Sequence, residues 1–404
     1  MRKAIQALLI LFAFSLPFKL FILHYIPVPI FILWLIEGDL ADKWHRLRKD
    51  PIFWLFVAIT MLYFVSYLWS DSTTGGYFGR ITAHYGLYDT MERYGFRWLL
   101  LPVMLTTVDR KLFKSIISAF LLAMVISEVI SYGIFFHLWE IGRADPNDPT
   151  PFLHHTAYST FLVFTVFILL TRFFDERWLP LKAGYLLFAL SAIANLFLNG
   201  GRTGQLAFLL CAIYWTFHRY RASIKAFAVM AAATTLVLLI AYESSPVFQK
   251  RLSETKETLH KMRHNQYQTS FGQRVAIWEM TIDVLREHPI AGAGIGDARA
   301  AVADAVERYA PDKRYILQMP HVHNQFLLAW LQTGIVGMLL WILYFWLFFR
   351  SYFYAYEGYA KVYAISLLIF MLVDSPYHFT LGISYILFFT GLFFGYKRSV
   401  EASA

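Results

Sequence analysis

Long apolar segments recur along the whole chain, and they constrain its fold more than any other feature. A helix of roughly 20 apolar residues crosses the hydrocarbon core of a bilayer, and a shorter one suffices where the protein thins the bilayer. Of the 404 residues, 58% are hydrophobic and only 16% are charged, which excludes a water-soluble globule with a solvated surface. The sequence therefore predicts an all-α polytopic membrane protein.

Twelve segments fit transmembrane helices, with boundaries uncertain by several residues. They lie at approximately 4–21, 23–37, 51–69, 92–107, 115–137, 154–171, 183–199, 203–217, 226–242, 323–349, 362–375 and 379–396. The first pair contains Lys19 and several prolines, so it forms either two short helices with a tight turn or one broken re-entrant segment. No small-residue cleavage site follows the basic start, so we expect a retained first helix rather than a signal peptide.

The basic residues predict the orientation of these helices. If the N-terminus is cytoplasmic, every short inside loop is basic, as in Lys43-Trp44-His45-Arg46, whereas the outside loops carry mainly Arg80, Arg93, Arg97, Arg143 and Arg202. This bias follows the positive-inside rule and predicts that both termini are cytoplasmic. The formal net charge of +9 then reflects topology, and we expect no nucleic-acid partner.

One polar segment divides the chain into three parts. We predict transmembrane helices over 1–242, a polar outside loop or cap domain over 243–322, and further transmembrane helices over 323–404. Within the loop, apolar spacing predicts helices over 275–285 and 298–309. The glycine-rich string 292–296 between them lacks the surrounding βαβ unit of a dinucleotide site, so we interpret it as a close turn.

Three residues stand at junctions between polar and apolar segments and are candidates for chemistry. His323 precedes a long apolar helix, and an imidazole there can accept a proton near neutral pH or can simply pack against the helix. Arg202, in the turn Asn199-Gly200-Gly201-Arg202-Thr203-Gly204, can bind a phosphate or snorkel to the interface. Arg274, which begins a loop helix, has the same two interpretations.

The sequence offers little support for a metal site. His321 and His323 are two residues apart rather than four, and no HExxH pattern or carboxylate cluster accompanies them. The single cysteine, Cys211, lies in an apolar run, so we expect neither a disulfide nor a cysteine-based metal site. We therefore expect no metal and no cofactor.

Several other polar residues are candidates for supporting roles. Asp374, near the outer end of a predicted span, should pair with a histidine or arginine and can orient His323. Asn324 can cap the helix that follows it. Two further groups either contact the acceptor or belong to the interface at headgroup level: the histidines His154, His155, His321 and His378, and the arginines Arg80, Arg93, Arg97 and Arg143.

An ordered set of short motifs resembles the O-antigen ligase and polymerase superfamily. The motifs are Asn199 to Gly204, Gly272-Gln273-Arg274 with Trp278, His288 to Gly294, His321-Val322-His323-Asn324 and Thr333 to Gly337. They cover roughly 195–340 in detail, and elsewhere only the layout of spans is comparable. The long outside loop before a single HxHN string is most similar to the O-antigen ligases of Gram-negative bacteria.

The resemblance implies a fold and a reaction. It implies a GT-C-like enzyme of the bacterial inner membrane with a periplasmic active site. Such an enzyme transfers a glycan from undecaprenyl diphosphate to a sugar hydroxyl of the lipid A core, without metal or nucleotide and with inversion. By motif match, His323 would be the general base, and Arg202 and Arg274 would hold the diphosphate. Membrane lipids, the lipid-linked donor and the lipid A core are the implied partners.

Two alternatives remain open at this stage. An O-antigen polymerase or a protein O-oligosaccharyltransferase of the same superfamily would share the base and the arginines and differ in acceptor. A membrane transporter would also have many spans and intramembrane charges. However, the sequence shows no corresponding glycine- or proline-interrupted helices in two halves, which many transporters contain.

Overall fold

The computed structural model is built from helices, as the apolar segments predict. It describes residues 1–18, 22–70, 94–142, 144–221, 223–264, 266–319 and 321–403. Within these ranges no strand is present, and the only β-type pairing is an isolated bridge between Asp145 and Asp148. The prediction of an all-α protein is confirmed for this part of the chain.

Eight helices among the described residues are long and apolar enough to cross a membrane. They are α5 with η2 (Pro51–Trp69), α9 (Arg110–Phe135), α10 (His155–Asp175), α11 (Leu179–Leu198), α13 (Ile224–Ser244), α17 (Gln325–Arg350), η5 with α18 (Tyr354–Val373) and α19 (Thr380–Glu401). The chain is therefore a polytopic membrane protein.

The other predicted spans correspond to helices that fall short of this standard. The first pair forms α1 (Arg2–Ser15), η1 (Leu16–Phe18), α2 (Ile22–Tyr25) and α3 (Pro27–Ile36), and residues 19–21 lie outside the described ranges. The fourth forms the short apolar helices α7 (Phe96–Trp98) and α8 (Leu100–Thr107). The eighth is α12 (Arg202–Tyr220), which has 19 residues but is less apolar. The number twelve and the GT-C-like topology stay predictions.

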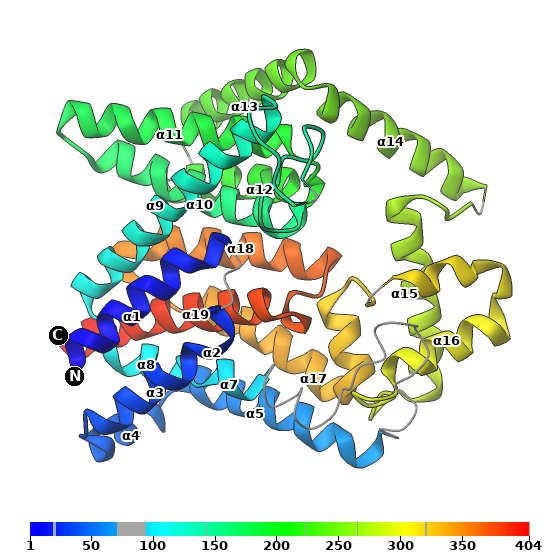
Figure 1. Ribbon diagram of the computed structural model, residues 1–404, viewed down its shortest axis with the longest axis horizontal. Helices are drawn as coiled ribbons and strands as arrows, with labels where there is room; N and C mark the ends of the chain where they lie inside the picture. The colour runs from blue at the N-terminus through cyan, green and yellow to red at the C-terminus, as the bar shows by residue number, and fades with distance from the viewer. Residues whose placement is uncertain are drawn as a thin grey trace.

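The helices form one bundle with a smaller unit at one end (Figure 1). The two ends of the chain lie together at the left of the view, beside α4 (Leu40–Leu47), and the loop helices α15 (Ser270–Glu287) and α16 (Ala298–Tyr309) lie at the opposite end. In the interior, α19 has 89% of its span buried, whereas α13 has only 6% buried and lies at the periphery. The centre of the bundle is thus the C-terminal helix.

The loop between α13 and α17 is largely helical. The predicted helices over 275–285 and 298–309 lie within α15 and α16, and the 3-10 helix η4 (Pro311–Gln318) follows. A further helix that the sequence interpretation missed, α14 (Pro246–Arg263), extends from the end of α13 towards α15 (Figure 1). We call α15, α16 and η4 the cap, because they share an apolar core of their own that packs on α17.

Two glycines join the cap to α17. Gly292 in the cap turn and Gly334 in α17 both have positive φ, at 67° and 75°, which a residue with a side chain rarely adopts. Gly334 kinks α17 there, and the two backbones exchange hydrogen bonds, Ala293 N–H to Leu331 O at 2.8 Å and Ile335 N–H to Ile290 O at 3.0 Å. The glycine string is therefore a close turn, as predicted, and it fixes the cap against the helix that follows His323.

Candidate functional site

The chain places two histidines around one carboxylate at the corner where α17 begins and α18 ends. Asp374 follows α18 directly and has only 8% of its side chain exposed. Its Oδ1 lies 3.3 Å from Nδ1 of His323 and 3.5 Å from Nε2 of His321. The three side chains come from segments about 50 positions apart in the sequence, so only the packing of α17 against α18 brings them together.

The proton on His321 can be assigned from its hydrogen bond. The backbone N–H of His323 donates to Nδ1 of His321 at 3.2 Å, so the proton of the neutral ring is on Nε2, which faces Asp374. Burial, with a further contribution from His323, lowers the pKa of His321 to about 3. His321 is therefore neutral near pH 7 and supports the carboxylate with an N–H group.

Asp374 remains ionised in this setting. Burial alone would raise the pKa of Asp374, but the contacts with His323 and His321 and the N–H of Ser375 outweigh it and lower the pKa to about 2. A carboxylate beside Nδ1 of His323 favours the tautomer with its proton on Nδ1. The other ring nitrogen, Nε2, then has a lone pair that can accept a proton.

The backbone around His323 is held from several sides. His323 has a φ of 54°, an uncommon conformation for a residue other than glycine. Asn324 caps α17 by accepting from the N–H groups of Phe326 and Leu327, and its own amide donates to the carbonyl of Leu372 at 3.1 Å. Asn324 is thus the predicted helix cap, and it also ties the start of α17 to the end of α18 beside Asp374.

The cap holds the same segment from the other side. Trp278 of α15 donates its indole N–H to the carbonyl of Val322, between the two histidines, at 2.9 Å. Arg299 of α16 donates to the carbonyl of Met319 at 3.2 Å. A strained conformation persists only where the surroundings determine it, and these bonds supply that constraint.

A cavity of about 440 Å³ lies against the histidines. We call it the main cavity because it adjoins the candidate site. One part of its lining is polar and the other is apolar: His24, His154, His321, His323, Asp374 and Thr380, with Leu23, Leu153, Ala157, Phe370, Phe379 and Leu381. Such a cavity can take a molecule that has both polar and hydrocarbon parts.

Arg274 is a cation whose charge acts on this corner. It lies in the first turn of α15, one helical turn before Trp278 and therefore on the same face. Its charge acts on Asp374, His321 and His154. Within the described part of the chain, its half-buried guanidinium makes no hydrogen bond or ion pair, so its donors are available to an anion.

Arg202, in contrast, is already paired. It is the first residue of α12, and it donates to Oε2 of Glu254 at 3.1 Å and to the hydroxyl of Thr255 at 3.0 Å. Both partners belong to α14, the helix that the sequence interpretation missed. Arg202 and Arg274 are close enough for their charges to interact. The charge of Arg202 thus acts on Arg274, and the charge of Arg274 acts on Asp374.

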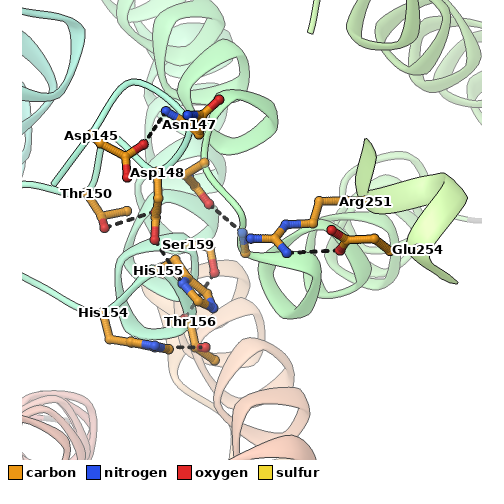
Figure 2. Close-up of polar contacts among 12 residues, drawn as sticks. Asp145, Asn147, Asp148, Thr150, His154, His155, Thr156, Ser159, Arg251 and Glu254 are labelled. Atoms are coloured by element: carbon orange, nitrogen blue, oxygen red, sulfur yellow. Dashed lines mark hydrogen bonds and ion pairs between the residues drawn. The ribbon is translucent and has the colours of Figure 1, made fainter. Parts of the chain in front are cut away.

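The glycines beside Arg202 pack against protein rather than against an open space. A Cβ on Gly201 or Gly204 would lie within 2.6 Å of the Ser159 side chain on α10. The Asn199 side chain accepts from the N–H of Gly201 at 2.9 Å and closes the turn, and Figure 2 shows Ser159 beside this turn. Close helix packing therefore explains Gly201 and Gly204.

The remaining candidates divide into three groups. His154 lines the main cavity, and the His378 ring lies 5.5 Å from that of His321 beside a smaller cavity of about 40 Å³. His155 pairs with Asp148 at 3.1 Å, on the far side of the Gly201 turn from Arg251 (Figure 2). The predicted residues Arg80, Arg93 and Arg143 lie outside the described residues.

Arg97 lies inside the helix bundle. Its side chain is fully buried, and it donates to Nδ1 of His24 at 3.0 Å and to the hydroxyl of Thr380 at 3.1 Å, two residues that line the main cavity. His24 and Thr380 were missed by the sequence interpretation. The only sequence signal for His24 was a polar side chain inside a short apolar segment.

The histidine corner is also the place to consider a metal. Among the described residues, His321, His323 and Asp374 offer donor atoms within 4.8 Å of one another, a grouping that can hold an ion. A metal-bound histidine normally donates its other ring N–H to a neighbour. His321 instead accepts an N–H at Nδ1, which leaves a proton rather than a lone pair facing Asp374. These residues therefore fit a hydrogen-bonded group better than a metal site.

Comparison with known proteins finds a relative and a family model that each match part of the chain. A protein of Haemophilus influenzae described as uncharacterized is 25% identical over 188 residues. The alignment covers 45% of this chain and 45% of that protein, so the chain spans less than half the length of this relative. The family model for O-antigen ligase matches residues 186–342, which include Arg202, Arg274 and His323. Residues 186–342 are thus similar to the O-antigen ligase family.

Proposed function

We propose that this chain is an O-antigen ligase with His323 as its general base. In this proposal, a glycan linked to undecaprenyl diphosphate is transferred to a sugar hydroxyl of the lipid A core, which completes a lipopolysaccharide molecule. The observation that carries the proposal is the arrangement of His323 against an ionised Asp374, within the electrostatic reach of Arg274, which has no partner among the residues that the structure describes.

The first step is activation of the acceptor. Nε2 of His323 takes the proton of the sugar hydroxyl as the oxygen attacks the anomeric carbon of the donor. Asp374 stabilises the imidazolium that forms, as the carboxylate does in a Ser-His-Asp triad. A positioned base of this kind contributes about 10² to 10⁴ in rate.

The second change is departure of the diphosphate. As the bond between the anomeric carbon and the phosphate oxygen breaks, its electron pair remains on undecaprenyl diphosphate. Guanidinium groups bind phosphate oxygens through paired N–H donors and stabilise the charge that accumulates in the transition state. In this proposal Arg274 and Arg202 have that role, and no metal is required. A single displacement inverts the anomeric centre.

The topology of the proposal follows from the two ends of the bundle. Both chain ends lie at one end, which carries basic residues such as Lys43 and Arg46 of α4, and the cap lies at the other (Figure 1). With the basic end in the cytoplasm, the histidine corner beneath the cap faces the periplasm of a bacterial inner membrane. The mixed lining of the main cavity suits a glycan donor whose carrier is a hydrocarbon chain.

A reconstituted assay tests the function. Purified protein is mixed with undecaprenyl-diphosphate glycan and, in separate reactions, with lipid A core, a second lipid-linked glycan or a hydroxylated peptide. Lengthening of the lipid A core supports the ligase. Lengthening of the second glycan indicates a polymerase, and modification of the peptide indicates a protein O-oligosaccharyltransferase. Either of these outcomes, or no transfer at all, would refute the ligase proposal. Comparison of the anomeric configuration in donor and product tests inversion.

A further inference from the structure

Arg251 of α14 lies beside the Gly200 turn and has no role in the donor site proposed above. Arg251 donates to Oε2 of Glu254 at 3.0 Å, and Arg202 donates to the same oxygen at 3.1 Å. Two guanidinium groups thus share a single carboxylate oxygen. Figure 2 shows Arg251 and Glu254 extending from α14 towards the turn, with their contact dashed.

The turn itself places Arg251 beside Arg202. A Cβ on Gly200 would lie 2.8 Å from Nη2 of Arg251, so the guanidinium lies against the backbone of the turn that begins α12. The side chains of Arg202, Arg251 and Glu254 are each about one-third exposed, at 32%, 29% and 30%. Solvent, and therefore a ligand, can reach this cluster.

Among the described residues, the positive charges of the cluster outnumber the negative charges. Arg202, Arg251 and Arg274 contribute three positive charges, whereas Glu254 contributes one negative charge in direct contact with two of them and Asp374 contributes one that acts on Arg274. A carboxylate and a phosphate oxygen make similar paired contacts with a guanidinium fork. Glu254 thus stands where a phosphate oxygen would be bound.

We propose that Arg251 is a third guanidinium of the donor diphosphate site, and that Glu254 occupies this site in the free protein until the diphosphate displaces it. This inference rests on the proposed function, because it takes a lipid-linked diphosphate as the ligand. The ligand is a diester with one negative charge on each phosphate, and loss of the glycan adds about one more. Three arginines freed from Glu254 match the charge of the leaving group better than that of the bound donor, which favours the transition state.

The exchange also explains why the contact is held by α14. Glu254 and Thr255 are adjacent on this helix, and both contact Arg202. When a phosphate takes the place of Glu254, Thr255 can keep its bond to Nη1 of Arg202 and hold the fork in position. The diphosphate then bridges α12, α14 and α15, the helices that carry Arg202, Arg251 and Arg274.

Binding of undecaprenyl diphosphate to the purified full-length protein in detergent tests the inference directly, without any acceptor. We expect Arg251→Ala to raise the Kd about tenfold, as does loss of a hydrogen bond between charged groups, and Arg251→Lys to restore only part of the affinity. Glu254→Gln should lower the Kd about threefold, because a neutral side chain no longer competes with phosphate.

Matched controls lie on the same helix. Glu257→Gln and Arg263→Ala change one carboxylate and one guanidinium elsewhere on α14 and should leave the Kd unchanged. If Glu254→Gln weakens binding instead, Glu254 positions the arginines and does not compete, and the displacement part of the inference is wrong. Because this variant is expected to bind more tightly, its result does not depend on whether Arg251→Ala folds.

The same experiment separates this inference from the proposed function. If Arg274→Ala and Arg202→Ala weaken binding while Arg251→Ala does not, the donor site stands and the role of Arg251 is refuted. If none of the three arginine variants changes the Kd, the diphosphate site of the proposed function fails and this inference fails with it. If binding responds as expected but no acceptor is glycosylated, only the ligase proposal is lost.

Discussion

The two sides of the candidate site are built in different ways. At the histidine corner, a buried carboxylate, two largely buried imidazoles and a strained backbone are held by hydrogen bonds from Asn324, Trp278 and neighbouring N–H groups. At the arginine side, partly exposed guanidinium groups are paired with one carboxylate or, in Arg274, with no described partner. The first side fixes an orientation, and the second retains donors for a ligand.

In the proposed function, the difference corresponds to two chemical needs. A general base must point at one hydroxyl with a single tautomer, so a rigid His323 would favour the proposed proton transfer. A diphosphate is large and changes its charge during the proposed reaction, so its cations would have to exchange partners. The predictions below test whether the histidine corner controls the turnover rate while the arginines control donor binding.

The largest effect is expected for His323→Ala. Loss of the base should lower kcat by about 10² to 10⁴, with little change in the Kd of undecaprenyl diphosphate. Steady-state transfer rates and binding are measured on the same preparation, and His264→Ala, on the surface of the loop, is the control. Unchanged turnover in His323→Ala would remove the base from the mechanism.

Asp374→Asn should have the second-largest effect. The variant keeps the shape of the side chain but removes the charge that stabilises the imidazolium, and loss of such a supporting partner typically costs about 10- to 100-fold. We expect kcat to fall by this factor and the donor KM to stay near its original value. A rise in KM with normal kcat would place Asp374 with the binding groups instead.

Arg274→Lys should have a smaller effect, and it should change the donor KM more than kcat. A lysine keeps the charge but cannot reproduce the paired donors of the guanidinium, so the donor KM should rise about tenfold with a smaller loss in kcat. Kinetics at several donor concentrations check this. Arg286→Lys near the other end of α15 serves as the control, because its guanidinium is exposed and pairs only with Asp283 among the described residues. A fall in kcat at constant KM would contradict the division between the two sides.

The smallest effect concerns stability towards acid. Burial and His323 lower the pKa of His321 from 6.5 to about 3, so between these values the unfolded chain binds a proton that the folded chain does not. Stability from this group is complete above pH 6.5 and is lost as the pH falls, by about 1 kcal/mol at pH 5.5. Thermal unfolding in detergent should therefore show a smaller loss between pH 7.5 and 5.5 in His321→Asn than in the original protein. An equal loss in both would mean that His321 titrates normally.

Local sequence patterns predicted the membrane helices better than the polar helix α14 of the loop. Apolar segments of 18 residues or more, such as those that form α9 and α17, can be predicted as helices from the sequence. The reason is that the bilayer requires every backbone polar group to be hydrogen-bonded within the segment. The helix α14 was missed because its residues are mostly polar and many are charged, so no apolar face indicated it. Its capping residue Ser245 and the proline at its first turn were the available signals.

The candidate site was predicted unevenly for a similar reason. Arg202, Arg274 and His323 were found because each lies in a recognisable motif at the start of a helix. Arg251 and Glu254 lie in no motif, and the contact of Glu254 with Arg202 depends on where α14 meets the first residue of α12. His24 and Thr380 line the cavity only because α2 and the start of α19 meet beside the histidines.

The amino-acid sequence by itself determined that the chain forms many apolar helices, because backbone polar groups in lipid must be hydrogen-bonded within their own segment. It also showed the motifs that resemble the O-antigen ligase family, because each motif consists of neighbouring residues. The tertiary structure alone decided which charges meet. His323 and Asp374 are 51 positions apart, and Arg202 and Glu254 are 52 apart, since the intervening helices must cross the bundle and return before these side chains come into contact. Charge interactions depend on distance in space, and that distance is set by how the helices pack.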